Sequence, residues 1–548
     1  MSGYNMKDYE KTKKEFKLEV PEYYNWVRDW FDTMGEENPD KLGLLWVDDL
    51  GNEKRFTFSE LTDYSKRFAN ILKDNGVKKG DVLTVMLSRN WEFWIAFLGC
   101  LRAGVVVAPG TAMLSDKDIQ YRVDRSESTA IITDIDNAEK VEAVKDDCKT
   151  LHAMILTGDE KREGWVNFNE AIQNVSPEFE TENTRYDDDA IIYFTSGTVG
   201  HPKMTLHTHA SYPLGHTITG KFWLDLTPED LHFNIGDTGW AKAAWSNVFG
   251  PWNCGAAVFA HKPGGGKFGP ERNLQLMEEY PITTMCGPPT IYRVFVQDDL
   301  SKYNFKHLRH CIAAGEPLNP EVIEEWKKHT GITIRDGFGQ TETCLLVGTF
   351  PCLDVKQGSM GKPAPGYHVD VIDEEGNPMG VNQEGDIAVK IKPERPVGLF
   401  KEYWKDPEKT EATFRGDWYL TGDRAMKDED GYFWFVGRDD DVIISSGYRI
   451  GPFEVESALV EHPAVAESAV VASPDETRGE IVKAFIILAK EYKPSDELAK
   501  EIQDFVKNNT APYKYPREIE FVDELPKTVS GKIRRVELRE KEKKRKEK

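Results

Sequence analysis

Short apolar runs alternate with helix-length polar segments through the middle of the chain. The runs Ala130–Thr133, Ile155–Thr157 and Ala190–Thr195 are bounded by charges and turn residues, which is typical of strands buried in a parallel sheet. The most apolar stretch, Trp91–Pro109, is interrupted by charges and glycines and is therefore too broken to span a membrane. We expect a helix there, followed by a buried strand at Gly104–Ala108. The pattern predicts an α/β fold.

The pattern changes towards the C-terminus. Strand-like runs occur at Asp441–Ser445, Ala464–Ala472 and Ile481–Leu488. Pro452 is placed to begin a helix, and Ser495 to cap a second, amphipathic one. This segment predicts a small α+β domain.

The chain of 548 residues exceeds what one core supports, since single cores stop growing at roughly 250–300 residues. We expect a large N-terminal domain of layered sheets and helices at 1–436, a hinge at 437–443 and a small mobile domain at 444–548. The charged tail from Glu540 is expected to be a solvated, fraying helix end. It has no apolar or aromatic face with which to bind a membrane or a nucleic acid.

Charge and cysteine content narrow the class of protein. The net charge of −23 argues against nucleic-acid binding, which needs excess Lys and Arg. The 7 cysteines include no Cys-x-x-Cys pair, which indicates a reducing compartment rather than disulfides or zinc. Met1–Phe16 contains no apolar signal segment. We expect a soluble, cytoplasmic protein without a membrane span, and its oligomeric state stays open, with a homo-oligomer among the options.

Candidate chemistry begins directly after the run Ala190–Thr195. The next residues are Ser-Gly-Thr-Val-Gly-His-Pro-Lys, ending at Lys203. Gly197 and Gly200 let backbone N–H groups approach an anion, while hydroxyls and the lysine add donors and positive charge. The spacing G-x-x-G-x-x-K differs from that of P-loop NTPases. Alone, the segment supports an anion site and an ordinary strand–loop turn about equally.

Further motifs follow this loop in a fixed order. They are Ala313-Ala-Gly-Glu-Pro317, Asp336-Gly-Phe-Gly-Gln-Thr-Glu342, Tyr419-Leu-Thr-Gly-Asp423, Gly437-Arg-Asp-Asp-Asp-Val-Ile443, Ser446-Gly-Tyr-Arg449 and Pro526-Lys-Thr-Val-Ser-Gly-Lys532. Together with the loop they resemble the acyl-adenylate-forming superfamily of acyl-CoA synthetases, luciferases and peptide-synthetase adenylation domains. The resemblance spans residues 40–540. It departs at Val199, where the family usually has a small or hydroxyl residue, and this puts one phosphate contact in doubt.

The resemblance implies a site for ATP and Mg²⁺. Glu342, together with Thr198, would hold the metal, a hard ion that suits carboxylate and phosphate oxygens. Asp423 would accept from both ribose hydroxyls, with Arg438 as its partner, and Thr341 would contact the α-phosphate. The residues implied for ATP and AMP are Thr195, Ser196, Gly197, Thr198, Gly200, Gly315, Glu316, Pro317, Asp336, Gly337, Phe338, Gly339, Gln340, Thr341, Asp423 and Arg438.

The resemblance also implies two half-reactions. A carboxylate attacks the α-phosphate of ATP, and pyrophosphate leaves. The catalytic residues implied for this step are Lys532, which would bridge the carboxylate and the α-phosphate, with Glu342, Thr341 and Lys203. The small domain would then rotate, and the thiol of coenzyme A would attack the acyl carbonyl.

This rotation assigns a second group of residues. Asp440 matches the hinge position, and Ser446, Gly447 and Tyr448 would face the pantetheine of coenzyme A. A side chain at Gly447 would obstruct that narrow channel. Arg449 matches a residue at the mobile domain interface.

Gly339 bears on which acid is used. Acetate-specific family members resemble Asp-x-Trp-Trp-Gln-Thr-Glu here, and their second Trp closes the acyl pocket. Gly339 stands in that place, so we expect a medium-chain, branched or aromatic acid. The segments Ile235–Trp245 and Arg449–Glu456 look closest to medium-chain acyl-CoA synthetases.

The acyl pocket is expected to be lined by Trp240, Ala241, Lys242, Trp245, Ala314 and Gly339. Lys242 is unusual beside an alkyl chain. It either extends outward to solvent or contacts the carboxylate or a polar group of the acid, and the sequence does not decide between these. Cys286 and Cys344, near these motifs, are interpreted as small hydrophobic residues.

Three rival functions can be separated from this one. An adenylating enzyme that uses a carrier protein is disfavoured by Ser446–Arg449, and acceptor-dependent AMP release would test it. A non-catalytic binding protein could have lost Lys532 and Glu342, and both are present. A P-loop kinase or ATPase disagrees with the loop spacing and would release ADP rather than AMP.

Overall fold

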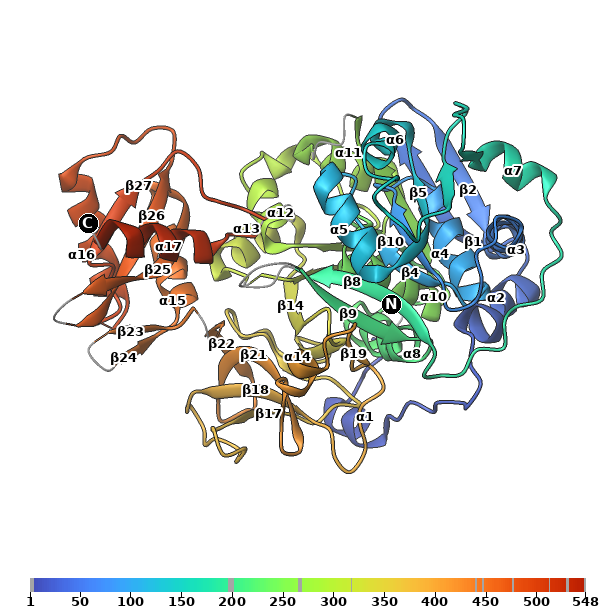
Figure 1. The fold of residues 1–548 in the computed structure, drawn as a ribbon. Helices are drawn as coiled ribbons and strands as arrows, with labels where there is room; N and C mark the ends of the chain where they lie inside the picture. The colour runs from blue at the N-terminus through green and yellow to red at the C-terminus, as the bar shows by residue number, and fades with distance from the viewer. Residues whose placement is uncertain are drawn as a thin grey trace.

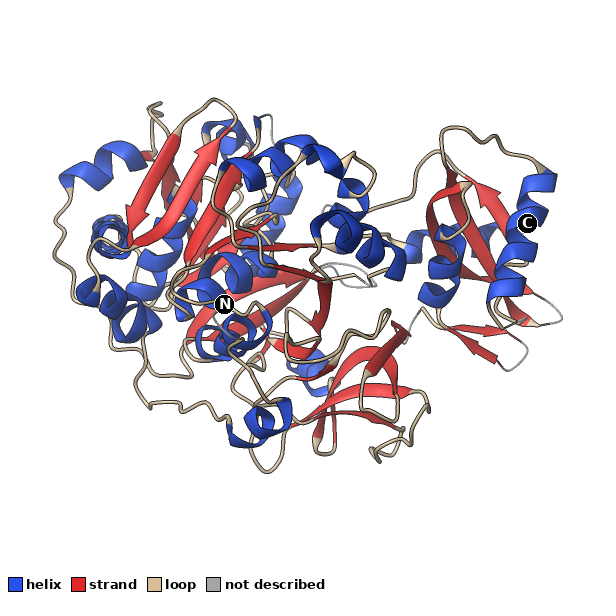
Figure 2. Cartoon of the chain, turned by 180° about the vertical axis from the view of Figure 1, so that it is seen from behind, coloured by secondary structure: helices blue, strands red, loops and turns tan. Residues whose placement is uncertain are grey.

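The computed structural model describes residues 4–195, 202–264, 269–316, 318–438, 441–445, 448–475, 478–511, 513–528 and 532–546. Within these ranges the chain folds into four sheets with helices packed around them (Figures 1 and 2). The α-helices are α1 Tyr9–Glu15, α2 Asp32–Glu37, α3 Phe58–Asp74, α4 Glu92–Arg102, α5 Asp116–Ser126, α6 Ile135–Glu142, α7 Phe168–Asn174, α8 Ser211–Ile218, α9 Ala241–Ala244, α10 Gly250–Asn253, α11 Pro270–Glu279, α12 Pro289–Phe295, α13 Pro320–Thr330, α14 Pro407–Glu411, α15 Pro452–Val460, α16 Asp496–Asn509 and α17 Arg535–Lys546.

The first sheet is mostly parallel and ends in an antiparallel hairpin. Its order is β19 Glu402–Tyr403, β9 Lys203–Thr208, β8 Asp189–Thr195, β4 Val106–Pro109, β3 Val82–Met86, β5 Ser128–Thr133, β6 Ala153–Leu156 and β7 Val166–Asn167. Strands β3 to β8 pair in parallel, whereas β9 is antiparallel to both β8 and β19. The buried strands predicted in this region and the helix–strand pair α4–β4 are confirmed.

The second sheet has the same mixed character. Its order is β16 Lys362–Pro363, β15 Leu345–Gly348, β14 Ile334–Gly339, β13 His310–Ala314, β12 Thr284–Gly287, β10 Leu231–Asn234, β11 Ala257–Lys262, β1 Leu42–Asp48 and β2 Glu53–Thr57. The strands from β14 to β1 run parallel, and the edge pairs are antiparallel. Helices α3 and α4 pack closely because Gly99 has no side chain: a Cβ there would lie 2.8 Å from the Phe68 ring.

A smaller antiparallel sheet completes the large domain. It contains β17 Val369–Ile372, β18 Gly385–Lys390, β20 Phe414–Arg415, β21 Trp418–Lys427 and β22 Phe433–Arg438. The predicted hinge, 437–443, thus lies between the end of β22 and the start of the fourth sheet.

The small domain is an α+β unit. Its sheet contains β23 Ile443–Ser445, β24 Tyr448–Ile450, β25 Val465–Asp475, β26 Gly479–Leu488 and β27 Glu518–Phe521. Helix α16 is capped as predicted, since the Ser495 hydroxyl accepts from the Leu498 N–H at 3.1 Å. In both views this domain stands beside α13 of the large domain (Figures 1 and 2). The Asn319 amide donates to the Ser457 hydroxyl across the interface at 3.4 Å.

The prediction of a solvated helix end holds for the exposed helical residues Glu540, Lys541 and 543–546, but it is wrong at Glu542. Glu542, in the last turns of α17, is fully buried. Its carboxylate accepts from the Lys483 ammonium at 2.6 Å and from the Ser473 hydroxyl at 3.0 Å. The charge pattern misled because a charged residue can be buried when it is paired.

The part of the chain that the structure describes contains no helix long and apolar enough to cross a membrane. All seven cysteines are free thiols.

Candidate active site

The predicted phosphate loop lies at the turn of the β8–β9 hairpin. Thr195 and Lys203 face each other at the end of that hairpin. The Lys203 ammonium lies over the ring of Tyr403, 4.9 Å from its centroid. The other loop residues, Ser196, Gly197, Thr198 and Gly200, lie outside the described residues.

Two buried side chains donate hydrogen bonds to the Thr341 carbonyl. The Tyr212 hydroxyl donates to it at 2.6 Å, and His207 Nε2 lies 2.7 Å from the same oxygen. Burial lowers the pKa of His207 to about 3, so the ring is neutral at pH 7 and Nε2–H acts as the donor. The two donors fix the peptide that carries Glu342.

Glu342 is oriented by a strand distant in sequence. Its Oε1 accepts from the Tyr403 hydroxyl at 2.7 Å. Burial, and next the neighbouring Glu342, raise the pKa of Tyr403, so the hydroxyl stays protonated and donates. Lys203, Tyr403 and Glu342 therefore form one row at the base of the phosphate loop.

Asp423 and Arg438 lie directly opposite each other on β21 and β22, and their joint contact with the ribose stays a prediction. The Gln340 amide donates to Asp423 Oδ2 at 2.6 Å and to the Thr421 carbonyl at 2.7 Å. Burial raises the pKa of Asp423 to about 6, while Arg438 and Gln340 oppose that rise.

The expected adenine wall forms where β13 and β14 end. Gly315 has φ of 102°, which favours glycine. Glu316 is tied to α12, because its Oε2 accepts from the Thr290 hydroxyl at 2.7 Å and from Arg293 at 3.1 Å. Asp336 is buried, and burial raises its pKa to about 8. Phe338 is half-buried beside it, and Pro317 lies outside the described residues.

Trp223 packs against Gly337 of the expected adenine wall. A Cβ at Gly337 would lie 2.4 Å from the Trp223 ring. Trp223 also contacts Trp245 of the expected acyl pocket, with ring centroids 5.7 Å apart. Nucleotide wall and acyl pocket therefore share one packed aromatic layer. Trp240 and Ala241 precede Trp245 at the start of α9 and are half-buried.

Lys242 does not extend outward to solvent, so that interpretation is wrong. Its ammonium donates to the Ala314 carbonyl at 2.6 Å, because the short α9 directs it across the end of β13. Burial, and also Lys532, lower the pKa of Lys242, whereas Cys286 and Glu316 raise it. The alternative, contact with the acid, stays a prediction.

Gly339 allows two strands to approach closely. A Cβ there would lie 2.6 Å from the Cys344 carbonyl oxygen. The register of β14 against β15 shifts between Phe338 and Gly339, which marks a bulge. Gly339 thus has a backbone role in addition to the absence of a bulky side chain.

Lys532 faces the large domain. Its charge lowers the pKa of Asp423 and also that of Lys242. The charge of Lys532 is therefore within electrostatic reach of both Asp423 and Lys242 of the expected acyl pocket.

The predicted CoA and hinge residues are only partly described. Asp440, Ser446, Gly447 and the side chain of Arg449 lie outside the described residues. Tyr448 is 52% exposed and stacks on Tyr513, with ring centroids 4.4 Å apart.

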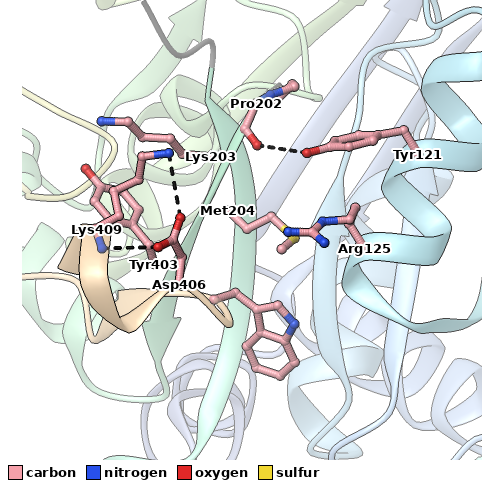
Figure 3. Close-up of a pocket in the computed structure, with 9 residues that line it drawn as sticks. Tyr121, Arg125, Pro202, Lys203, Met204, Tyr403, Asp406 and Lys409 are labelled. Atoms are coloured by element: carbon pink, nitrogen blue, oxygen red, sulfur yellow. Dashed lines mark hydrogen bonds and ion pairs between the residues drawn. The ribbon is translucent and has the colours of Figure 1, made fainter. Parts of the chain in front are cut away.

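An open pocket of about 450 Å³ lies beside the phosphate loop (Figure 3). It is lined by Tyr121, Arg125, Pro202, Lys203, Met204, Tyr403, Trp404, Asp406 and Lys409. Lys203 and Lys409 lie on one side of it and Arg125 of α5 on the other. Three cations against the single carboxylate of Asp406 give it a net positive charge that suits phosphate.

Sequence reasoning missed His207, Tyr212, Tyr403 and Trp223. His207 and Tyr212 occur in Leu206-His-Thr-His-Ala-Ser-Tyr212, directly after the loop, where an imidazole so close to a phosphate motif was a usable signal. Tyr403 and Trp223 carried none, because their partners are more than 60 residues away in sequence.

The described residues place Asp423 opposite Arg438 and bring Lys532 of the small domain within electrostatic reach of Asp423. The profile of the AMP-binding enzyme family matches residues 31–404, and that of the AMP-binding enzyme C-terminal domain matches 454–532. The chain therefore belongs to the AMP-binding enzyme family.

Known relatives agree over nearly the full chain. Acyl-coenzyme A synthetase ACSM3, mitochondrial, of Rattus norvegicus is 52% identical over 546 residues, covering 98% of this chain and 94% of the relative. Acyl-coenzyme A synthetase ACSM4, mitochondrial, of Homo sapiens is 48% identical over 532 residues, covering 95% and 91%.

Two solved structures have the same architecture. The anthranilate CoA ligase AuaEII in complex with anthranoyl-AMP has a TM-score of 0.88 at 30% identity, covering 96% of this chain and 99% of that one. Brucella canis acyl-CoA synthetase has a TM-score of 0.75 at 34% identity, covering 99% and 100%. The predicted fold class, family and enzyme class, an AMP-forming acid–CoA ligase, are confirmed.

The expectation of a cytoplasmic location is wrong. The relatives from rat and human carry mitochondrial names. The sequence argument failed because the absence of a secretory signal and of disulfides excludes only export, and a reducing organelle satisfies both observations.

Proposed function

We propose that the protein converts a medium-chain, branched or aromatic carboxylic acid to its acyl-CoA through an acyl-adenylate, using ATP and releasing AMP and pyrophosphate. The observation that carries this proposal is the position of Lys532. A lysine of the small domain acts electrostatically on Asp423 and on Lys242 of the large domain. These are the places where ribose and acid are expected.

The first step joins two anions, the carboxylate and the α-phosphate of ATP. Their repulsion has to be offset by fixed positive charge in a site that holds them in line. Lys532 bridges the two groups, and Lys203 supports the phosphates from β9. Thr341, held by Tyr212 and His207, contacts the α-phosphate while pyrophosphate leaves.

Mg²⁺ would be held by Glu342, with Thr198 as a second ligand. No group of three or more His, Cys, Asp or Glu able to hold a metal occurs among the described residues. This fits Mg²⁺ bound with a nucleotide, which needs one or two carboxylates and takes its other ligands from phosphate and water. Tyr403 occupies Glu342 Oε1, which leaves Oε2 for the ion. When bound, Mg²⁺ neutralises phosphate charge.

The second step transfers the acyl group to coenzyme A. Rotation about Asp440 withdraws Lys532 and brings Ser446, Gly447 and Tyr448 to the pantetheine, with Arg449 at the new domain interface. The thiol sulfur attacks the acyl carbonyl, and AMP leaves. The cationic pocket around Arg125 and Lys203 suits the phosphates of coenzyme A.

The acyl pocket sets the size of the acid. Trp245, Trp240 and Ala314 supply its apolar lining, and Gly339 leaves its end open. One methylene changes apolar binding by only about 1–3 kcal/mol, so acids of neighbouring length are used together.

The test is acid-dependent formation of AMP and thioester from MgATP and CoA, with acids from acetate to octanoate and with benzoate. We expect AMP and acyl-CoA with C4–C8 or aromatic acids. A preference for acetate would contradict the argument from Gly339. ADP as product, or dependence on a carrier protein, would contradict the proposed reaction.

A further inference from the structure

The described residues on either side of the lysine loop, 527–528 and 532–533, are hydrogen-bonded to each other and form its base. The Thr528 N–H donates to the Lys532 carbonyl at 2.7 Å, and the Lys532 N–H donates to the Thr528 hydroxyl at 3.1 Å. Lys527 and Ile533 form an antiparallel bridge next to them. The position of Lys532 therefore depends on what anchors this base.

The anchor is an ion pair at the first residue of α17. Arg535 donates through NH2 to both carboxylate oxygens of Glu456, at 2.7 and 2.9 Å. Glu456 is 8% exposed, and its Oε1 also accepts from the Val470 N–H at 2.8 Å, which fixes it to β25. A bidentate pair of this kind fixes orientation as well as distance.

A second contact joins α17 to the end of the predicted hinge. Arg539 forms an ion pair with Asp441, and Arg535 NH1 lies 4.0 Å from the same carboxylate. Leu538 is buried between these arginines against the small-domain core. The base of the lysine loop, α17 and Asp441 at the end of the predicted hinge are therefore linked by direct contacts.

The helix that carries Glu456, α15, also contacts the large domain. Ser457, next to Glu456, accepts from Asn319 of the large domain, and Phe453 of the same helix packs edge-on against Phe435 of β22, with centroids 6.4 Å apart. A close sequence of contacts thus runs from the large domain through α15 to Arg535, three residues from Lys532.

We propose that Glu456 and Arg535 are positioning residues for adenylation: they transmit the docking of α15 on the large domain to the placement of Lys532. This inference rests on the proposed role of Lys532. It concerns only the first half-reaction, because Lys532 is withdrawn in the second.

The experiment measures the two half-reactions separately in the full chain. Adenylation is followed by acid-dependent exchange of pyrophosphate into ATP, and thioester formation by mixing chemically prepared acyl-adenylate with CoA. We expect Glu456→Gln and Arg535→Gln to slow adenylation by about tenfold to a hundredfold, since small misplacements of a catalytic group cost that much. Thioester formation should stay within about twofold of wild type.

Three further variants separate positioning from folding. Glu456→Gln keeps a side-chain oxygen that can accept from the Val470 N–H. Arg535→Lys keeps the positive charge but loses the planar guanidinium that donates to both carboxylate oxygens. The adenylation rate of Arg535→Lys should therefore lie between those of wild type and Arg535→Gln. The double variant Glu456→Gln/Arg535→Gln should be no slower than either single one, because both remove the same interaction. Lys541→Gln, which removes an exposed ion pair of α17 with Glu520 at 2.6 Å, is the matched control and should change neither rate.

Equal loss of both half-reactions would overturn the proposal, as would unchanged adenylation in Glu456→Gln and Arg535→Gln. A separate result would contradict the proposed role of Lys532 itself. If Lys532→Ala formed the adenylate at the wild-type rate, that role would be wrong, whatever the rates of the Glu456 variants.

Discussion

At the residue scale, burial places the ionisation of Asp423 close to neutral pH. A carboxylate accepts from two ribose hydroxyls, whereas the protonated acid has lost one acceptor oxygen. The folded site raises the pKa of Asp423 to about 6, above the usual value of 3.8. The competent form therefore predominates at pH 7 and is lost as the pH falls through 6.

We predict that the KM for ATP rises about tenfold between pH 7 and pH 5, as expected for loss of one ionised group with a pKa near 6. Initial rates at saturating acid across this range would show it. Asp423→Asn should bind ATP more weakly at pH 7, and its KM for ATP should no longer rise between pH 7 and pH 5. If the KM for ATP of Asp423→Asn depended on pH as it does in wild type, the titrating group would be a residue other than Asp423.

The sequence motifs predicted which segments the fold brings together at the candidate nucleotide site. Gln340, Asp423 and Arg438 lie in contiguous motifs, and the fold only had to bring β14, β21 and β22 together. The supporting residues were not predictable. Tyr403 reaches Glu342 across 61 positions, and Trp223 donates to the Asp336 carbonyl across 113. Contacts of that kind are created by tertiary packing and leave no local pattern.

At the element scale, hydrophobic patterning located the buried strands and the capped helix α16, but it misread α17. That helix is almost wholly charged. Ion pairs hold its inner face, where most amphipathic helices carry apolar side chains. Patterning fails there because the buried charges are compensated by oppositely charged residues that are distant in sequence.

We predict that Glu542→Gln destabilises the protein by about 3 kcal/mol, because it leaves the buried Lys483 ammonium with incomplete compensation. Lys483 keeps Glu520 at 2.7 Å, which limits the loss. Denaturant unfolding of the full chain would measure it, with Lys541→Gln as the exposed comparison. Equal stability of the two variants would mean that the buried pair contributes no more than a surface one.

At the scale of the whole molecule, like charges face each other where the domains meet. Burial, and next Glu461 of the small domain, raise the pKa of Glu321 on α13. This repulsion disfavours the arrangement in which Lys532 faces the site. It weakens as the pH falls through the raised pKa of Glu321.

We predict that Glu461→Gln raises the rate of adenylation relative to thioester formation by about twofold at pH 7, the effect of a few tenths of a kcal/mol between exposed charges. Added salt should shrink the difference. Glu497→Gln, on the exposed face of α16, is the control. A ratio that did not respond to Glu461→Gln would show that this charge pair does not influence the domain arrangement.

The close approach of β15 to Gly339 has an evolutionary consequence. Any side chain at this position would meet the Cys344 carbonyl before it could narrow the acyl pocket. A lineage could not acquire a preference for acetate by exchanging this glycine alone, since the bulge beside it would have to be rebuilt first. We expect the preference for larger acids to be entrenched: the first mutational step towards acetate loses stability before it gains a new substrate.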